Sequence, residues 1–297
     1  MKYLIGLLLI LLSNAVVANN LSPHQEVEQL LKLEATVDKN TSAYFKIVDA
    51  ISDRLRFIDE RAKDDVDYIL VNIGSQRLDI IDNLRVSSSQ RVIVGRDSRR
   101  TPIFSDEITH IVTRPYWNIP RSLARKDILP KLRSNPALVE SDGFEMIDIK
   151  TGATILPFDL NMDLNRYRIR QKPSDVNALG KVKFMFAPNP NRSIFLHGTP
   201  LEHLFDESVR RYSSGCIRVE NSEVIERFIM GRKLPKNNKE DQWIKPVNTT
   251  KVHIVDWPIY FENGELVLDN STNKKFEPSP TLINLQPSND NIPKNLL

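Results

Sequence analysis

The sequence predicts a mainly β protein of the α+β class, with a short N-terminal helical segment and a subdomain inserted into the sheet. Short β-type runs recur about every ten residues from Tyr68 onwards, which is typical of an antiparallel meander. Helical periodicity is concentrated before residue 62. A stretch over 121–170, divided by proline, asparagine and glycine, interrupts the strand pattern and predicts the inserted subdomain.

Composition narrows the functional classes. The 297 residues carry 41 Lys+Arg against 38 Asp+Glu, a net charge of +3, so no nucleic-acid partner is expected. The apolar share of 40% is that of a globular protein. A single cysteine, Cys216, excludes an intramolecular disulfide. The five histidines lack metal-ligand spacing, so we expect neither a metal nor another cofactor.

The first 18 residues are typical of a secretory signal peptide. A positive start at Lys2 precedes an almost wholly apolar run from Leu4 to Leu12, and small residues end the segment at Ala18. An uncleaved membrane anchor is the alternative, although the run is shorter than the about 20 residues that span a bilayer. We expect an exported protein, periplasmic or cell-wall associated, with no integral membrane segment after cleavage.

Residues 19–62 are predicted to form the helical segment. Apolar residues recur at helical steps around Leu30 and again around Val48, and a polar break over 38–42 separates the two stretches. Residues 63–270 are predicted to form the main domain, including the insertion at about 121–170. The segment 271–297 is rich in asparagine, proline, serine and lysine, and we expect a flexible tail.

The strand signals begin with the meander and resume after the insertion. The predicted runs are 68–73, 78–81, 91–95, 182–186, 193–197, 217–219, 251–255 and 265–268. Alternation in the fifth run places Phe195 and His197 on one face of a strand. A helix capped by Asn221 or Ser222 is predicted to follow the sixth run and to end at Gly231.

Two short motifs carry candidate chemistry, His197-Gly198-Thr199-Pro200 and Ser213-Ser214-Gly215-Cys216-Ile217-Arg218-Val219. A free thiol has a pKa near 8.5, so only a small fraction is nucleophilic thiolate at pH 7. An imidazole in contact with Cys216 would take the proton and hold the thiolate as an ion pair. A lone cysteine before a strand is also a common core residue, and His197 could equally be structural.

The turn before the cysteine adds weight to a catalytic role. Gly215 lets the backbone approach closely, so that N–H groups could face a substrate carbonyl and stabilise an oxyanion. Together with a single cysteine in an exported chain, the two motifs favour a cysteine nucleophile.

These motifs closely resemble the signature of the L,D-transpeptidases, the YkuD catalytic domain, in its YcbB-like branch. Further segments agree in order and spacing: 68–73, 92–96, Thr101-Pro102, 117–120, 127–131 and 177–184. The resemblance covers roughly residues 50–270. It implies a β-sandwich catalytic domain with a capping subdomain over the active site.

The resemblance also implies roles for individual residues. Cys216 is the nucleophile, His197 the base, and the Gly198 carbonyl the group that orients the imidazole. The N–H groups of Ser214, Gly215 and Cys216 would form the oxyanion hole. The residues implied as substrate contacts, each with a structural role as the alternative, are Arg218, Phe195, Tyr212 and Ser213. Trp117 and Asn177 are implied to shape the cap hinge and the pocket wall. His203 is a weaker candidate base.

The activity implied is 3-3 cross-linking of peptidoglycan stem peptides. The enzyme would form a thioester from a tetrapeptide stem, release D-alanine and transfer the acyl group to a second stem. Carbapenems are implied as inhibitors. An L,D-carboxypeptidase, attachment of a protein lysine to peptidoglycan, and a non-catalytic wall-binding protein stay open as alternatives. With only a short helical segment ahead of the matching region, no peptidoglycan-binding module is expected.

Overall fold

A computed structural model describes residues 20–189, 193–234, 239–262 and 264–268. The expected signal peptide over 1–18 and the expected flexible tail over 271–297 lie outside these residues. Within the described part, no helix has the length and apolar character required to cross a membrane. The fold is mainly β with few helices, as the sequence predicts.

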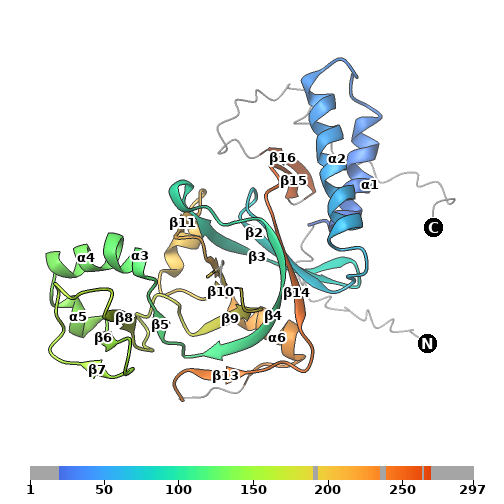
Figure 1. The fold of residues 1–297 in the computed structure, drawn as a ribbon. Coiled ribbons are helices and arrows are strands. Elements are labelled where there is room, and N and C mark those ends of the chain that lie inside the picture. Colours follow the sequence, from blue (N-terminus) through green and yellow to red (C-terminus); the bar gives the residue numbers. More distant parts are fainter. Residues whose placement is uncertain (1–19, 190–192, 235–238, 263, 269–297) are drawn as a thin grey trace, which may run out of the picture.

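Two antiparallel helices form the N-terminal segment, α1 (Pro23–Glu34) and α2 (Ser42–Glu60). Ser22 caps α1 in a capping box with Gln25, and Thr41 caps α2. The helices pack on a hairpin, β15 (Ile259–Glu262) and β16 (Glu265–Leu268), at one side of the molecule (Figure 1). Their shared core consists of Leu30, Ile47, Ala50, Ile51 and Phe261.

One large sheet forms the body of the protein. Its strands are β1 (Tyr68–Asn72), β2 (Arg77–Asp82), β3 (Arg85–Gly95), β4 (Phe104–Thr113), β9 (Val182–Phe186), β10 (Leu196–His197), β11 (Arg211–Ser213), β12 (Ile217–Val219), β13 (Gln242–Ile244) and β14 (Thr250–Val255). The order is β11-β3-β12-β10-β9-β4-β14-β1-β2, with β13 beside β4. Because the long strand β3 pairs with both β2 and β12, the sheet curls round and closes on itself.

Alternate side chains of this sheet fill its apolar core. Val182, Phe184 and Phe186 of β9 point inward, and Leu196 and Ile217 join them from β10 and β12. Helix α6 (Ser222–Met230) packs against the same core; Asn221 caps it and Gly231, at φ +65°, ends it, as the sequence predicts. The core therefore fixes which residues of β9, β10 and β12 face the other way.

The chain between β4 and β9 forms the inserted cap. It contains β5 (Trp117–Asn118), α3 (Arg121–Leu123), a π-helical turn η2 (Ala124–Ile128), α4 (Leu129–Ser134), α5 (Leu138–Ser141), β6 (Phe144–Asp148), β7 (Thr154–Ile155) and β8 (Tyr167–Gln171). Its four strands form a separate sheet over an apolar cluster of its own. The cap lies on the side of the main sheet away from α1 and α2 (Figure 1). It reaches slightly beyond 121–170, because β5 pairs with the end of β8.

The sequence reading missed β4, which lies between β9 and β14 in the sheet. Its first half alternates charged and polar residues, Ser105, Asp106, Glu107 and Thr109, with few apolar ones, so it shows no clear strand pattern. Two short 3-10 helices complete the catalytic side, η1 (Asp97–Arg99) after β3 and η3 (Glu202–Asp206) after β10.

Candidate active site

The two predicted catalytic motifs meet on neighbouring parallel strands. Leu196 of β10 pairs with Ile217 of β12, and His197 pairs with Arg218. Since Leu196 and Ile217 lie in the core, His197 and Arg218 face the opposite side. Phe195 lies two residues before His197 and Cys216 two residues before Arg218, so they share that side. The Phe195 and His197 rings are 5.6 Å apart, which agrees with this placement.

The imidazole of His197 is held by the backbone. Its Nδ1 lies 2.5 Å from the Gly198 carbonyl oxygen, which can only accept, so the proton sits on Nδ1 and Nε2 carries the lone pair. The orienting role expected for Gly198 is therefore present. Burial, reinforced by the nearby Arg218 cation, lowers the pKa of His197 to about 3. The imidazole is thus neutral and has the protonation state of a general base.

Cys216 is half-buried beside it, and its thiol lies 3.7 Å from the Ser193 carbonyl oxygen. Burial raises the pKa of the Cys216 thiol to about 11, against the opposing effects of the Phe195 N–H and the Arg218 and Lys183 cations. These shifts favour a neutral thiol beside a neutral imidazole over a thiolate–imidazolium pair. Among the described residues no hydrogen bond joins Sγ to the imidazole, an arrangement common in substrate-free sites.

Hydrogen bonds define the loop that ends at Cys216. Gly215 has φ +119°, which favours glycine, and a Cβ there would lie 3.1 Å from Ile194 Cδ1. The Ser213 hydroxyl donates to the Cys216 carbonyl at 2.5 Å and accepts the Gly215 N–H at 3.0 Å. Thr101 Oγ1 donates to the Gly215 carbonyl at 2.9 Å. The loop is braced from both sides.

This brace corrects two expectations. The Gly215 N–H is engaged by Ser213, so it is not a free oxyanion donor; the N–H groups of Ser214 and Cys216 make no hydrogen bond within the described residues and remain available. Ser213 is only 2% exposed and stabilises the loop instead of lining the substrate groove.

Comparison with known proteins agrees with this geometry. The family model of the YkuD L,D-transpeptidase catalytic domain matches residues 66–254, well over half of the chain. This chain belongs to that family. A Haemophilus influenzae relative that carries the provisional name L,D-transpeptidase is 31% identical over 211 residues, 67% of this chain and 42% of the relative. The chain thus spans less than half the length of that relative.

Solved structures of L,D-transpeptidases give only partial overlaps. The Enterococcus faecium enzyme is 11% identical with a TM-score of 0.30, over 64% of this chain and 50% of that one. An L,D-transpeptidase in complex with imipenem is 12% identical with a TM-score of 0.30, over 64% and 59%. An avibactam carbamoyl enzyme is 10% identical with a TM-score of 0.34, over 79% and 81%.

The cap of this L,D-transpeptidase domain touches the catalytic loop through Arg99. The Arg99 guanidinium donates to Ser214 Oγ at 3.1 Å and to Asp127 of the cap at 2.5 Å. Arg96 lies 3.5 Å from the other oxygen of Asp127. The sequence gives no local signal for this contact, because Arg99 and Asp127 lie 28 residues apart.

Two other implied site residues are structural. Asn177 is fully buried; its amide donates to the carbonyls of Pro115 and Lys172 at 3.2 and 2.8 Å, which ties together the two chain segments that lead into the cap. Trp117 packs against the apolar cluster of the cap. These contacts place both residues at the base of the cap, in agreement with the expected role at the cap hinge.

Tyr212 and His203 lie at the surface of the protein. Tyr212 is 43% exposed on the edge strand β11, next to the loop, where a groove residue is expected. His203 is exposed on η3, and no contact joins it to Cys216 within the described residues. His197 is therefore the base candidate that the geometry supports.

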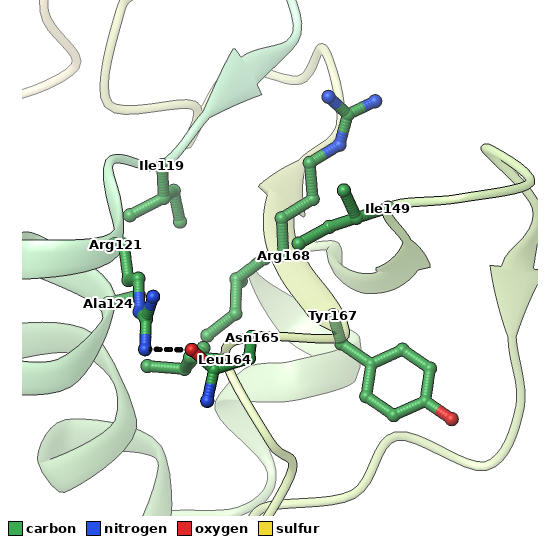
Figure 2. Close-up of a pocket in the computed structure, with 9 residues that line it drawn as sticks. Ile119, Arg121, Ala124, Ile149, Leu164, Asn165, Tyr167 and Arg168 are labelled. Carbon is green, nitrogen blue, oxygen red and sulfur yellow. Dashed lines mark hydrogen bonds between the residues drawn. The ribbon is translucent and has the colours of Figure 1, made fainter.

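A cavity of about 200 Å³ lies on the cap and not at Cys216. Figure 2 shows the Arg121 guanidinium directed at the Asn165 side chain, 2.5 Å away, over an apolar floor that includes Ile119 and Leu164. The described residues contain no cluster of three or more His, Cys, Asp or Glu side chains that could hold a metal ion.

Proposed function

We propose that this protein is a peptidoglycan L,D-transpeptidase that uses Cys216 as its nucleophile and His197 as its general base. The observation that supports this most directly is the shared face of β10 and β12: Cys216 lies two positions before Arg218, the residue that pairs with His197. Membership of the family supplies the substrate class.

In the proposed first half-reaction, Sγ of Cys216 attacks the carbonyl carbon between the third residue and the terminal D-alanine of a tetrapeptide stem. Nε2 of His197 takes the thiol proton as the C–S bond forms. The C–N bond then breaks, the proton passes from His197 to the leaving amine, and D-alanine departs. The N–H groups of Ser214 and Cys216 are placed to stabilise the oxyanion.

In the second half-reaction, the side-chain amine of another stem attacks the thioester. His197 takes a proton from this amine and returns it to the departing Cys216 sulfur, which regenerates the thiol. The product is a 3-3 cross-link. The neutral resting pair suits this cycle, because His197 begins each half-reaction able to accept a proton.

Intact-protein mass spectrometry with a carbapenem tests the nucleophile. We expect the wild-type chain to gain the mass of one carbapenem and Cys216→Ala to gain none. Ser214→Ala, which keeps the thiol, serves as the matched control and should still form the adduct. A wild type without an adduct, or a Cys216→Ala variant with one, contradicts the proposal.

Turnover with purified disaccharide tetrapeptide tests the acceptor. Dimers together with free D-alanine indicate transfer; tripeptide monomers alone indicate an L,D-carboxypeptidase. A third arm offers a lysine-bearing acceptor protein. Export to the periplasm or cell wall belongs to the same proposal, and fractionation of cells with an antibody to the native chain tests it.

A further inference from the structure

Two cations flank the catalytic histidine in one row across the sheet. Lys183 of β9 pairs with His197 of β10, and His197 pairs with Arg218 of β12. Directly paired residues on neighbouring strands lie side by side on one face. The row Lys183, His197, Arg218 therefore faces the side on which Cys216 lies, opposite the core residue Phe184.

Lys183 is a buried ammonium without an anion. It is only 8% exposed, and within the described residues it makes neither an ion pair nor a hydrogen bond. Its Nζ lies 5.2 Å from the centre of the Phe195 ring and 5.6 Å from that of Trp243. Asp241 acts on it electrostatically from a distance, but its carboxylate accepts the Trp243 indole N–H and the Tyr116 backbone N–H, each at 3.2 Å.

Arg218 is the second cation of the row. Its Nε is buried and has no hydrogen-bond partner among the described residues. Its charge acts on both His197 and Cys216. Buried charges in proteins are normally paired, so two unpaired cations beside one thiol leave this pocket short of a negative charge. An anionic ligand at the reacting centre supplies it.

We propose that Lys183, together with Arg218, binds the α-carboxylate of the leaving D-alanine and so selects donor stems that end at this residue. This inference rests on the proposed function. The carboxylate carbon lies within about 2.5 Å of the scissile nitrogen, so a group that binds it must stand next to Cys216. A stem that continues into a fifth residue has a neutral amide there and cannot form the same ion pair.

The selectivity has a defined physical origin. A charge-assisted hydrogen bond is stronger than a neutral one, and losing it costs a factor of about ten to a hundred in binding. The low exposure of Lys183, 8%, strengthens the interaction because a buried charge is less screened by water. A role limited to stabilising the Cys216 thiolate would instead favour every donor equally.

The test compares two donors on the full chain, a tetrapeptide stem with a free C-terminal acid and the same stem as a C-terminal carboxamide. The measured quantity is the ratio of kcat/KM for the acid to that for the amide, from the rate of thioester formation followed by intact mass. We expect the wild type to favour the acid by about tenfold or more. Lys183→Met should lower the ratio several-fold, to the part that Arg218 maintains alone, chiefly by raising KM for the acid, whereas Lys183→Arg should keep most of the preference.

The matched control is Lys181→Met, an exposed lysine just before the same strand, which should leave the ratio unchanged. If Lys183→Met does not fold, a measurement on the wild type replaces it. Added sodium chloride should raise KM for the acid donor more than KM for the amide donor. A ratio that survives Lys183→Met, equal loss on both donors, or equal salt effects overturns this inference alone. Wild-type protein acylated by neither stem overturns the proposed function, and this inference with it.

Discussion

Two buried histidines in the same sheet have opposite surroundings. His253 on β14 uses both ring nitrogens: Nε2 lies 3.0 Å from Asp65 Oδ2 and Nδ1 lies 2.8 Å from the Ser105 hydroxyl. The rings of Phe57 and Tyr68 pack edge-on against it, 5.1 and 5.2 Å away. His197 hydrogen-bonds to the backbone of Gly198 and Leu179 and has cations nearby, with no carboxylate partner.

The difference shows what separates a structural histidine from a base in this fold. Asp65 and Ser105 satisfy His253 and fasten the chain that follows α2 to the sheet. At His197 a backbone carbonyl fixes the tautomer without adding charge, and Arg218 and Lys183 disfavour the imidazolium. The His253 ring thus has a carboxylate and a hydroxyl as partners, whereas the His197 ring has only backbone partners and cations around it.

The largest expected effect is a difference in activity between variants of His197 and variants of His253. His197→Ala should lower the rate of thioester formation by about a hundredfold or more, because the thiol loses its proton acceptor. His253→Ala should retain most activity and lower the free energy of unfolding by about 1–3 kcal/mol, from the partners left buried. Acylation rates and urea unfolding check both. His203→Ala is the control, and its inactivation alongside an active His197→Ala would reassign the base.

A second large effect concerns the turn that positions His197. A Cβ on Gly180, which has φ +64°, would lie 2.6 Å from the Thr199 nitrogen and 2.7 Å from the Gly198 carbonyl carbon. Gly180→Ala should therefore cost about 3 kcal/mol and displace the orienting carbonyl. Gly198→Ala meets only ordinary contacts at 3.6 Å and should keep substantial activity. Equal losses of activity in the two variants would show that the packing of Gly180 does not position the Gly198 carbonyl.

The sequence alone could predict those site residues that lie within short motifs, and could not predict contacts that depend on the folded structure. Cys216, His197, Gly198 and Gly215 lie in two short motifs whose residue types state their chemistry. Lys183 gave a weaker signal, a charged residue alternating with apolar ones in Val182–Phe186, and its role required the register with His197. The link from Arg99 to Asp127 depends on how the cap sits on the loop.

The expectation for Ser213 is wrong for a physical reason. Ser213 adjoins the catalytic motif, which suggests a substrate contact, but its side chain is buried and donates to the Cys216 carbonyl inside the protein. Nearness in sequence to a site does not distinguish a residue that lines it from one that braces it.

The protonation of the catalytic pair predicts an unusual pH profile. With the pKa of His197 lowered to about 3 and that of Cys216 raised to about 11, the neutral pair persists across the intervening range. We expect kcat/KM for acylation to stay nearly constant between about pH 5 and pH 9. Limbs of the profile near the ordinary values of 6.5 for histidine and 8.5 for cysteine would contradict these shifts. Alkylation of Cys216 by iodoacetamide should correspondingly be slow at pH 7, and rapid labelling there would contradict the neutral pair.

His253 should affect the pH dependence of folding stability and not the rate of acylation. Burial lowers the pKa of His253 below its ordinary 6.5, even though Asp65 opposes the shift. The unfolded chain therefore takes up this proton first, and the stabilisation present above pH 6.5 is lost as the pH falls, by at most about 1.4 kcal/mol per pH unit. Thermal unfolding at pH 7.5 and 5.5 should show a larger decrease in Tm for the wild type than for His253→Gln. An equal decrease would mean that His253 binds its proton alike in both states.

The smallest expected effect concerns the ion pair between Arg99 and Asp127, which links the cap to the loop that ends at Cys216. Asp127 and Arg99 are 38% and 22% exposed, so their ion pair contributes no more than about 1 kcal/mol, or about fivefold. Asp127→Asn should raise KM for the donor stem by that factor or less, because Arg99 then holds Ser214 and the cap together less firmly. Glu140→Gln, an exposed cap carboxylate, is the control. The Tm should change little in either variant, since the contacts around His253 are untouched. A lower Tm in Asp127→Asn with an unchanged KM would show that the ion pair between Arg99 and Asp127 stabilises the fold and does not affect binding of the donor stem.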